Sequence, residues 1–134
     1  MAAHRLTIRV YYEDTDLAGI VYYANYLKFI ERGRTEALRA VGIDQARLRA
    51  ETGAVFVVRR LTADYRRPAR FDEVLTVETR VATLGRATLE CAQTVLRDGE
   101  RLFEAAVGLA VLGPAGTPIR LPAAVVQALG RLAD

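Results

Sequence analysis

Three carboxylates lie close together between a strand-like segment and a helix-like segment of the chain. They are Glu13, Asp14 and Asp16, within the sequence YEDTDLAGIVYYANY. Turn formation and capping account for Asp14 and Thr15, because short polar side chains bond to nearby backbone N–H groups. Asp16 differs, since the apolar segment LAGIV follows it and is expected to be packed. We therefore expect the Asp16 carboxylate in a partly dry site that faces the free N–H groups of the helix start.

A carboxylate beside backbone N–H donors is sufficient for only a few reactions. Thioester cleavage suits it, because a thiol of pKa about 8.5 leaves as the thiolate without a strong general acid. The carboxylate would attack the carbonyl carbon or deprotonate a water molecule, while the N–H groups would stabilise the oxyanion. Hydrolysis of an amide or a phosphate ester demands more catalytic groups than this segment offers.

The rest of the chain offers few other catalytic groups. The single histidine, His4, lies at the start of the chain, so a catalytic triad is not expected. The single cysteine, Cys91, lies in a predicted strand, where burial as a small apolar side chain is expected. The sequence has neither a zinc-binding set of Cys and His residues nor a glycine-rich phosphate loop. We expect no metal and no cofactor, and the absence of interleaved basic and aromatic residues argues against nucleic-acid binding.

Length and composition favour one globular domain, residues 1–134, since 51% of the residues are apolar and 26% are charged. No apolar run approaches the roughly 18 to 20 residues that span a bilayer, and the alternating N-terminus is unlike a signal peptide. One cysteine and no export signal favour the reducing cytoplasm. The net charge of +3 comes from arginine, since Lys28 is the only lysine. Dispersed arginines are typical of a solvated surface, and a phosphate-bearing ligand also fits them.

Hydrophobic periodicity predicts an α+β domain. Alternating apolar residues predict five strands, at residues 5–12, 54–67, 73–84, 86–97 and 101–112. Apolar residues at three- and four-residue spacing predict a long helix over 24–41, and shorter helices are expected at 44–52 and after Pro122. Short connections predict that the four later strands form an antiparallel meander, with the long helix across one face of the sheet. Gly33, inside that helix, indicates that another backbone packs closely there.

The chain resembles a known family in three segments, YEDTDLAGIVYYANYLKFIERGRTEAL, VRRLTADYRRPARFDEVLTVET and the closing PIRLP. The family is the 4-hydroxybenzoyl-CoA thioesterase-like branch of the hotdog-fold superfamily, particularly the Tol-Pal-associated acyl-CoA thioesterases. This resemblance implies a hotdog fold, in which a five-stranded antiparallel sheet wraps around one long central helix, here followed by a short C-terminal helix. It also implies homodimers that join two sheets, active sites made from both subunits, and commonly homotetramers.

The resemblance also assigns roles to residues of the acidic segment and beyond. Asp16 matches the family aspartate, as nucleophile or general base, and Tyr23 supplies the backbone N–H that polarises the thioester carbonyl. Arg86 matches a position that holds the phosphates of coenzyme A, and the weaker candidates for that role are Arg59, Arg60, Arg66 and Arg67. Other matching positions shape the loop and the substrate-binding wall, and they are Gly19, Val21, Tyr22, Asn25 and Tyr26. Many Tol-Pal-associated members carry histidine in place of Tyr23, whereas the hydroxybenzoyl-CoA type carries tyrosine there.

The expected function is hydrolysis of acyl-CoA thioesters to the free acid and CoA. The acyl group is left open between short aliphatic chains and aromatic groups such as 4-hydroxybenzoyl, and coenzyme A enters only as part of the substrate. The alternative is a non-hydrolytic module that binds acyl-CoA or acyl carrier protein, and the presence of the whole Asp16–Tyr26 motif argues against it. A dehydratase or hydratase of the same fold needs a histidine in its site, and His4 is badly placed to supply one.

Overall fold

The computed structural model describes residues 3–133, and the elements formed there agree with the α+β prediction. This described part contains five strands, three α-helices and one short 3₁₀ helix. In chain order the elements are β1 (His4–Arg9), η1 (Tyr12–Asp14), α1 (Asn25–Ala40), α2 (Gln45–Thr52), β2 (Val55–Tyr65), β3 (Val74–Leu84), β4 (Thr88–Arg97), β5 (Glu100–Leu112) and α3 (Ala123–Gly130). Within the same residues, no helix is both long and apolar enough to cross a bilayer.

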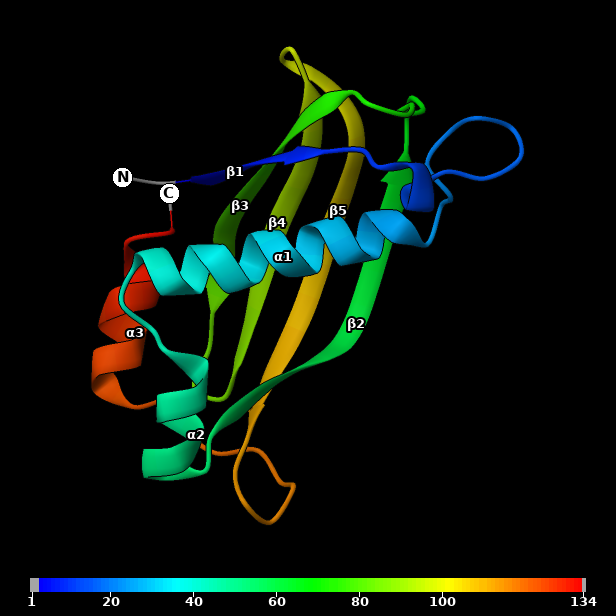
Figure 1. The fold of residues 1–134 in the computed structure, drawn as a ribbon. Coiled ribbons are helices and arrows are strands. Elements are labelled where there is room, and N and C mark those ends of the chain that lie inside the picture. Colours follow the sequence, from blue (N-terminus) through cyan, green and yellow to red (C-terminus); the bar gives the residue numbers. More distant parts are fainter. Residues whose placement is uncertain (1–2, 134) are drawn as a thin grey trace.

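The strands form one antiparallel sheet in the order β1-β3-β4-β5-β2 (Figure 1). The β3–β4–β5 meander is confirmed, but the prediction of a four-strand meander was wrong. β2 pairs with β5 at the far edge of the sheet and does not pair with β3. The alternation within a strand specifies which side chains face the core, and it carries no information on the neighbouring strand.

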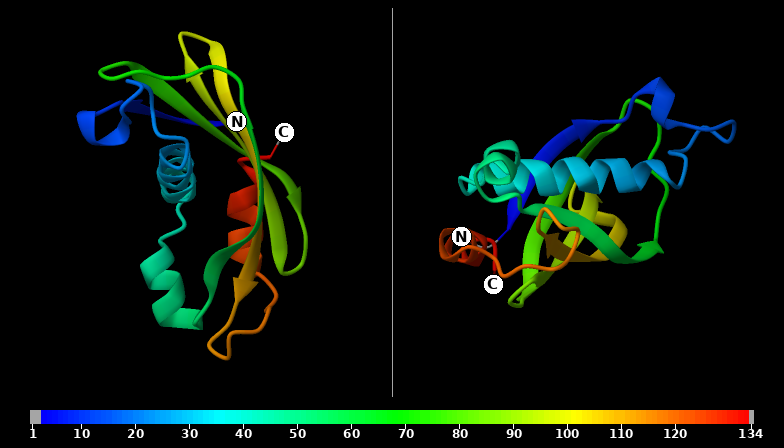
Figure 2. Two further views of the ribbon diagram at one scale, coloured as in Figure 1. Left: turned by 90° about the vertical axis from the view of Figure 1, so that its right-hand side faces the viewer. Right: turned by 90° about the horizontal axis from the view of Figure 1, so that it is seen from below.

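Helix α1 lies across the concave face of the sheet, which curves around it (Figure 2, left). One face of the helix is buried, and its buried residues are Tyr26, Phe29, Ile30, Gly33, Ala37 and Leu38. They join inward-facing sheet residues such as Val77, Val95 and Phe103 in a single core. This confirms the expectation of a sheet wrapped around one long helix. The C-terminal helix α3 follows as predicted, and the residues after it bond to β3 through the Leu132 carbonyl and the Val81 N–H.

The first strand ends earlier than the alternating pattern predicted. β1 stops at Arg9, and the chain turns into the 3₁₀ helix η1. The Asp14 carboxylate accepts a hydrogen bond from the Tyr11 N–H at 2.8 Å. This bond ties the chain into a local turn, as short acidic side chains commonly do. Tyr11 and Tyr12 consequently project into solvent instead of extending the strand.

Gly33 marks the closest approach of α1 to the sheet. A Cβ atom at this position would lie 2.5 Å from Val77 Cγ1 and 3.1 Å from Thr79 Oγ1. The prediction of close packing is confirmed, but the nearest neighbours are side chains of β3, with Gln93 of β4 at 3.3 Å, and not a backbone. Both side chains are buried, so they have little room to move aside.

A Gly33→Ala substitution is therefore expected to destabilise the protein. Overpacking costs about 1–3 kcal/mol, and the better helix propensity of alanine returns about 1 kcal/mol. We expect a net loss of up to about 2 kcal/mol in the free energy of unfolding, measured by urea denaturation. Gly130→Ala in α3 is the control, since nothing lies within 4 Å of a Cβ added there. A Gly33→Ala protein that gains as much stability as Gly130→Ala would contradict the close contact.

Candidate active site

The acidic segment between β1 and α1 forms a tight loop. Thr15 and Val21 pair as an antiparallel bridge at its base. Inside the loop, the Asp16 N–H donates to the Ile20 carbonyl and the Gly19 N–H donates to the Asp16 carbonyl, each at 3.0 Å. Gly19 has a φ of +79°, a conformation that side chains with a Cβ rarely adopt. Gly19 thus lets the chain turn towards the helix, which agrees with the expectation that it shapes the loop.

Asp16 is held by its own loop and faces solvent. Its Oδ1 atom accepts a hydrogen bond from the Ala18 N–H at 2.9 Å, and the residue is exposed. The expectation of a packed LAGIV segment and a partly dry carboxylate was wrong for the isolated chain, because Leu17 is 106% exposed and the loop projects beyond the sheet (Figure 1). Of this segment, only Val21 is fully buried. Exclusion of water from Asp16 therefore requires another molecule.

Polar side chains fasten the loop to the start of α1. The Asn25 amide Nδ2 donates to the Asp14 carbonyl at 2.9 Å, and the Thr15 hydroxyl donates to the Tyr12 carbonyl at 2.9 Å. Asp14 and Thr15 thus serve the local turn, as expected from their positions. They stabilise η1 and the loop, whereas the first turn of α1 contains no acidic residue.

Tyr23 lies directly before α1 and offers a free backbone donor. Within residues 3–133, its N–H has no hydrogen-bond acceptor, and the helix cap residue Ala24 has no side-chain cap. The Tyr23 carbonyl accepts a hydrogen bond from the Tyr65 hydroxyl at 2.9 Å. The ring of Tyr22 packs edge-on against that of Tyr23, with 5.0 Å between centroids. A helix start with free N–H groups and partial positive charge is suited to an oxyanion.

A small apolar hollow adjoins this helix start. Its volume is about 330 Å³, and it is lined by Ile20, Val21, Tyr23, Tyr26, Tyr65, Arg66, Arg67 and Pro68. Its floor includes Tyr26, whose ring stacks on that of Phe103 with 5.0 Å between centroids. The Tyr26 hydroxyl accepts a hydrogen bond from the Ala69 N–H at 3.0 Å. Burial raises the pKa of the Tyr26 phenol, so this side chain stays neutral. Tyr65 was not predicted as a site residue, because the alternating pattern of the sequence showed only which face of β2 this side chain occupies.

Arg86 lies far from this hollow in the same chain. Arg86 lies after the C-terminal end of β3. Arg70 lies before the N-terminal end of β3, and it forms a bridge with Ile20 of the acidic loop. Eleven strand residues separate the two ends, a span of roughly 35 Å. The β3–β4 turn and the acidic loop accordingly lie at opposite ends of the sheet in Figure 1. Arg59 and Arg60 line a separate hollow of about 210 Å³ with Thr83 and Thr88.

Cys91 is buried in β4, as expected for a small apolar side chain. Burial raises the pKa of its thiol to about 11, although the Arg34 charge opposes this shift. The thiol is therefore protonated near neutral pH and is a poor nucleophile. Among residues 3–133, no group of three or more His, Cys, Asp or Glu side chains is placed to hold a metal ion.

Comparison with known proteins agrees with this geometry. The model of the thioesterase superfamily matches residues 18–104. The chain is 45% identical over 103 residues to the acyl-CoA thioesterase YbgC of Haemophilus influenzae, covering 77% of this chain and 76% of that protein. It is 42% identical over 107 residues to the acyl-CoA thioester hydrolase YbgC of Escherichia coli O6:H1, covering 80% and 79%.

Solved structures show the same fold. The crystal structure of a probable thioesterase from Bartonella henselae has a TM-score of 0.87 and 40% identity, covering 90% of this chain and all of that one (100%). An aspartate-to-asparagine mutant of 4-hydroxybenzoyl-CoA thioesterase, complexed with 4-hydroxybenzoyl-CoA, has a TM-score of 0.89 at 22% identity, covering 96% and 99%. At that identity the likeness concerns the fold alone. The sequence match, the hotdog architecture and the loop before α1 together identify this chain as an enzyme of the thioesterase superfamily.

Proposed function

We propose that the protein hydrolyses the thioester bond of short aliphatic or aromatic acyl-CoAs, such as 4-hydroxybenzoyl-CoA, to the free acid and CoA. The observation that carries this proposal is the free Tyr23 N–H directly before α1, seven residues after an Asp16 carboxylate that the Ala18 N–H holds in its turn. The relatives named acyl-CoA thioesterase YbgC and acyl-CoA thioester hydrolase YbgC support it. The hollow beside Tyr23 lies near the lower end of the roughly 300–1,000 Å³ of ligand pockets, which supports a small acyl group.

Asp16 acts as nucleophile or as general base, and Tyr23 supplies the oxyanion donor. In the first route a carboxylate oxygen attacks the carbonyl carbon, the C–S bond breaks as CoA thiolate leaves, and water then hydrolyses the mixed anhydride. In the second route the carboxylate takes a proton from the attacking water molecule. In both routes negative charge develops on the thioester oxygen, and the Tyr23 N–H stabilises it. Val21 and Tyr26, which line the hollow, form walls around the acyl group, whereas Tyr22 does not line it and packs against the ring of Tyr23.

The enzyme acts as a homodimer that joins two β2 edges, and the dimers pair into homotetramers. β2 is a long edge strand with exposed apolar residues, among them Val58 (51%), Leu61 (38%) and Tyr65 (45%). Such an edge favours pairing with another strand. Antiparallel pairing about a two-fold axis would also bring Arg86 of one copy towards Asp16 of the other, where it could hold the CoA phosphates. A monomer in sedimentation velocity at assay concentration would contradict this assembly.

The decisive experiment is thiol release from a panel of acyl-CoAs with acetyl, butyryl, hexanoyl, benzoyl and 4-hydroxybenzoyl groups. We expect release of CoA thiol from at least one short or aromatic ester. The proposed place of action of the enzyme is the reducing cytoplasm. Calorimetric binding of the same esters without any thiol release would favour the non-hydrolytic module for acyl-CoA or acyl carrier protein. Hydration of crotonyl-CoA would indicate a hydratase instead.

Isotope labelling separates the two routes of attack. In a single turnover in ¹⁸O-labelled water, the covalent route leaves label in the Asp16 carboxylate whenever water attacks the carboxylate side of the anhydride. The general-base route leaves label only in the released acid. Mass spectrometry of the peptide that contains Asp16 distinguishes these outcomes.

A Tyr65→Phe substitution is expected to slow turnover while it leaves the fold intact. It removes the hydroxyl that donates to the Tyr23 carbonyl and so loosens the oxyanion donor. A neutral hydrogen bond contributes about 1 kcal/mol, so we expect kcat to fall by about 2- to 10-fold. Tyr12→Phe is the control, because the Tyr12 hydroxyl has no hydrogen-bond partner among residues 3–133. Equal kcat for both variants would remove Tyr65 from the site.

A further inference from the structure

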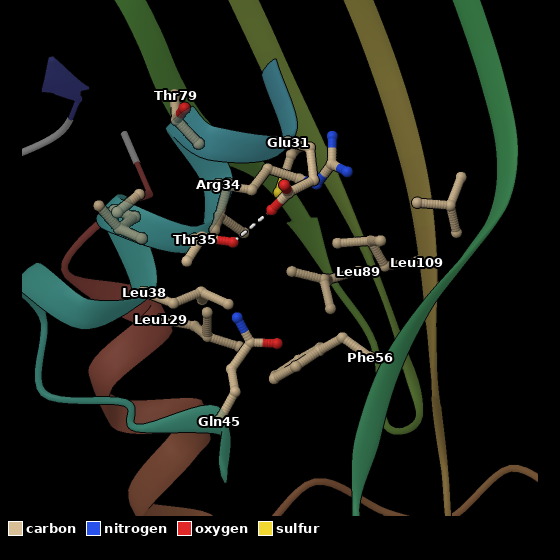
Figure 3. A pocket seen from close by; sticks show the side chains of 15 residues that line it. Glu31, Arg34, Thr35, Leu38, Gln45, Phe56, Thr79, Leu89, Leu109 and Leu129 are labelled. Carbon is tan, nitrogen blue, oxygen red and sulfur yellow. Dashed lines mark hydrogen bonds between the residues drawn. The ribbon is translucent and has the colours of Figure 1, made fainter. Parts of the chain in front are cut away.

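A second cavity, of about 240 Å³, lies between the middle of α1, the shorter helices and the sheet. Figure 3 shows that its walls come from α1, α2, α3 and β2 together with the neighbouring strands. Most of the wall is apolar and is formed by Leu38, Phe56, Val81, Leu89, Leu109 and Leu129. One end of the cavity carries the guanidinium of Arg34.

A buried amide holds Arg34 in this position. Arg34 Nη1 donates to Gln93 Oε1 at 2.9 Å. Gln93 Nε2 in turn donates to the Ile30 carbonyl at 2.8 Å and to Thr79 Oγ1 at 2.9 Å. Because Gln93 is 1% exposed and its amide donors are engaged, its oxygen stays directed at the guanidinium. The orientation of Arg34 is therefore set by the core and not by solvent.

Arg34 is a half-buried cation with a neutral partner. Among residues 3–133, no carboxylate lies within ion-pair distance of it. The Glu31 carboxylate, one turn earlier on α1, accepts a hydrogen bond from the Thr35 hydroxyl. Burial lowers the pKa of the Arg34 guanidinium, and the charge of Glu31 only partly opposes this. Beyond Gln93, the guanidinium N–H groups have no hydrogen-bond acceptor among residues 3–133, and they are not sealed from solvent. They are therefore available to an acceptor that enters the cavity.

We propose that this cavity binds a small molecule with an apolar body and one carboxylate, which pairs with Arg34. A guanidinium presents two parallel N–H donors that match a carboxylate, and the leucine and phenylalanine walls match an apolar body. The volume lies below the roughly 300–1,000 Å³ of common ligand pockets, so the ligand is small, of the size of benzoate or hexanoate.

This site is distinct from the acidic loop in the same chain. Arg34 lies eleven residues after Tyr23, or roughly 16 Å along the helix axis. The binding itself does not depend on the proposed thioester hydrolysis. If that hydrolysis holds, the released acid belongs to this ligand class, and the cavity is a product-binding site.

Titration of the protein with benzoate and with hexanoate, followed by NMR of ¹³C-labelled leucine methyl groups, tests the proposal. We expect shifts of the Leu89 and Leu109 methyl signals and weaker binding of the uncharged benzamide. Arg34→Met keeps most of the side-chain volume and removes the charge, and it is expected to weaken carboxylate binding about tenfold or more. Arg39→Met is the matched control, since Arg39 is an exposed arginine of the same helix paired with Glu36.

Three outcomes would overturn the proposal: no binding to the parent protein up to the solubility limit, equal binding to Arg34→Met, or loss of binding in Asp16→Asn. Loss of binding in Asp16→Asn would show that benzoate or hexanoate binds at the acidic loop and not in this cavity. The proposed hydrolysis would stay intact. If Arg34→Met fails to fold, Leu89→Phe keeps the charge and fills the cavity, and it is expected to abolish the ligand-induced shifts of the Leu109 methyl signals, which this variant retains. Binding that survives Leu89→Phe would also contradict the site.

Discussion

An Asp16→Asn variant is expected to fold and to bind acyl-CoA while its turnover falls by about 10²- to 10⁴-fold. An asparagine amide can neither attack the thioester carbonyl nor take a proton from water at neutral pH. Its Oδ1 atom can still accept the hydrogen bond from the Ala18 N–H, so the loop is expected to stay in place. The measurements are kcat from thiol release and the Kd of a CoA ester from calorimetry. A loss confined to kcat assigns the carboxylate to chemistry and not to binding.

Asp14→Asn is the matched control for this experiment. The Asp14 carboxylate lies two residues earlier and accepts a hydrogen bond from the Tyr11 N–H, which an asparagine can accept equally well. We expect its kcat to stay within about threefold of the parent value, because surface changes that keep their hydrogen bond have small effects. An Asp16→Asn enzyme with undiminished turnover would rule out Asp16 as the reactive group.

A Phe103→Ala substitution is expected to cost about 3–5 kcal/mol in the free energy of unfolding. Phe103 is 0% exposed. The centroid of its ring lies 5.0 Å from that of Tyr26 and 4.9 Å from that of Tyr65. Its removal leaves a cavity that these two tyrosines line. Since domains of this size have about 5–15 kcal/mol of stability in total, the loss should be plain in urea or thermal denaturation.

The same substitution is expected to reach the proposed active site. Tyr65 donates to the Tyr23 carbonyl, and Tyr26 forms part of the floor beside it, so loss of the Phe103 ring loosens both. We therefore expect kcat to fall even at temperatures where the variant is folded. Phe71→Ala is the control, because Phe71 is 56% exposed and should cost less than about 1 kcal/mol. Equal effects of the two substitutions would contradict the role assigned to the Phe103 cluster.

Local structure was largely readable from the sequence. The helix predicted over 24–41 is α1, at Asn25–Ala40, and each predicted strand contains or overlaps the observed one. This success has a simple cause, since the periodicity of apolar residues is fixed by the geometry of the element that buries them. The end of β1 was missed because it depends on one side-chain bond, from the Tyr11 N–H to Asp14, which competes with strand pairing.

The site was readable only in part. The sequence singled out Asp16 and the turn at Gly19, because both lie in one short segment whose residue types carry the information. It did not show that Leu17 and Asp16 face solvent, since burial depends on what surrounds a loop in space. The resemblance assigned Arg86 to the phosphates of coenzyme A, and only the structure showed that the length of β3 separates Arg86 from the acidic loop within one chain.

By itself, the sequence determined the fold class, the boundaries of most elements, the position of the acidic segment and, by resemblance, the family. These features are encoded in residue types and spacings within short windows of the chain. The tertiary structure alone decided that β2 lies beside β5, that Tyr65 holds the Tyr23 carbonyl, and that Arg34 is fixed by Gln93 at the end of a cavity. Each of these contacts joins residues far apart in the chain. Such contacts form only when the whole core packs, and no local pattern specifies them.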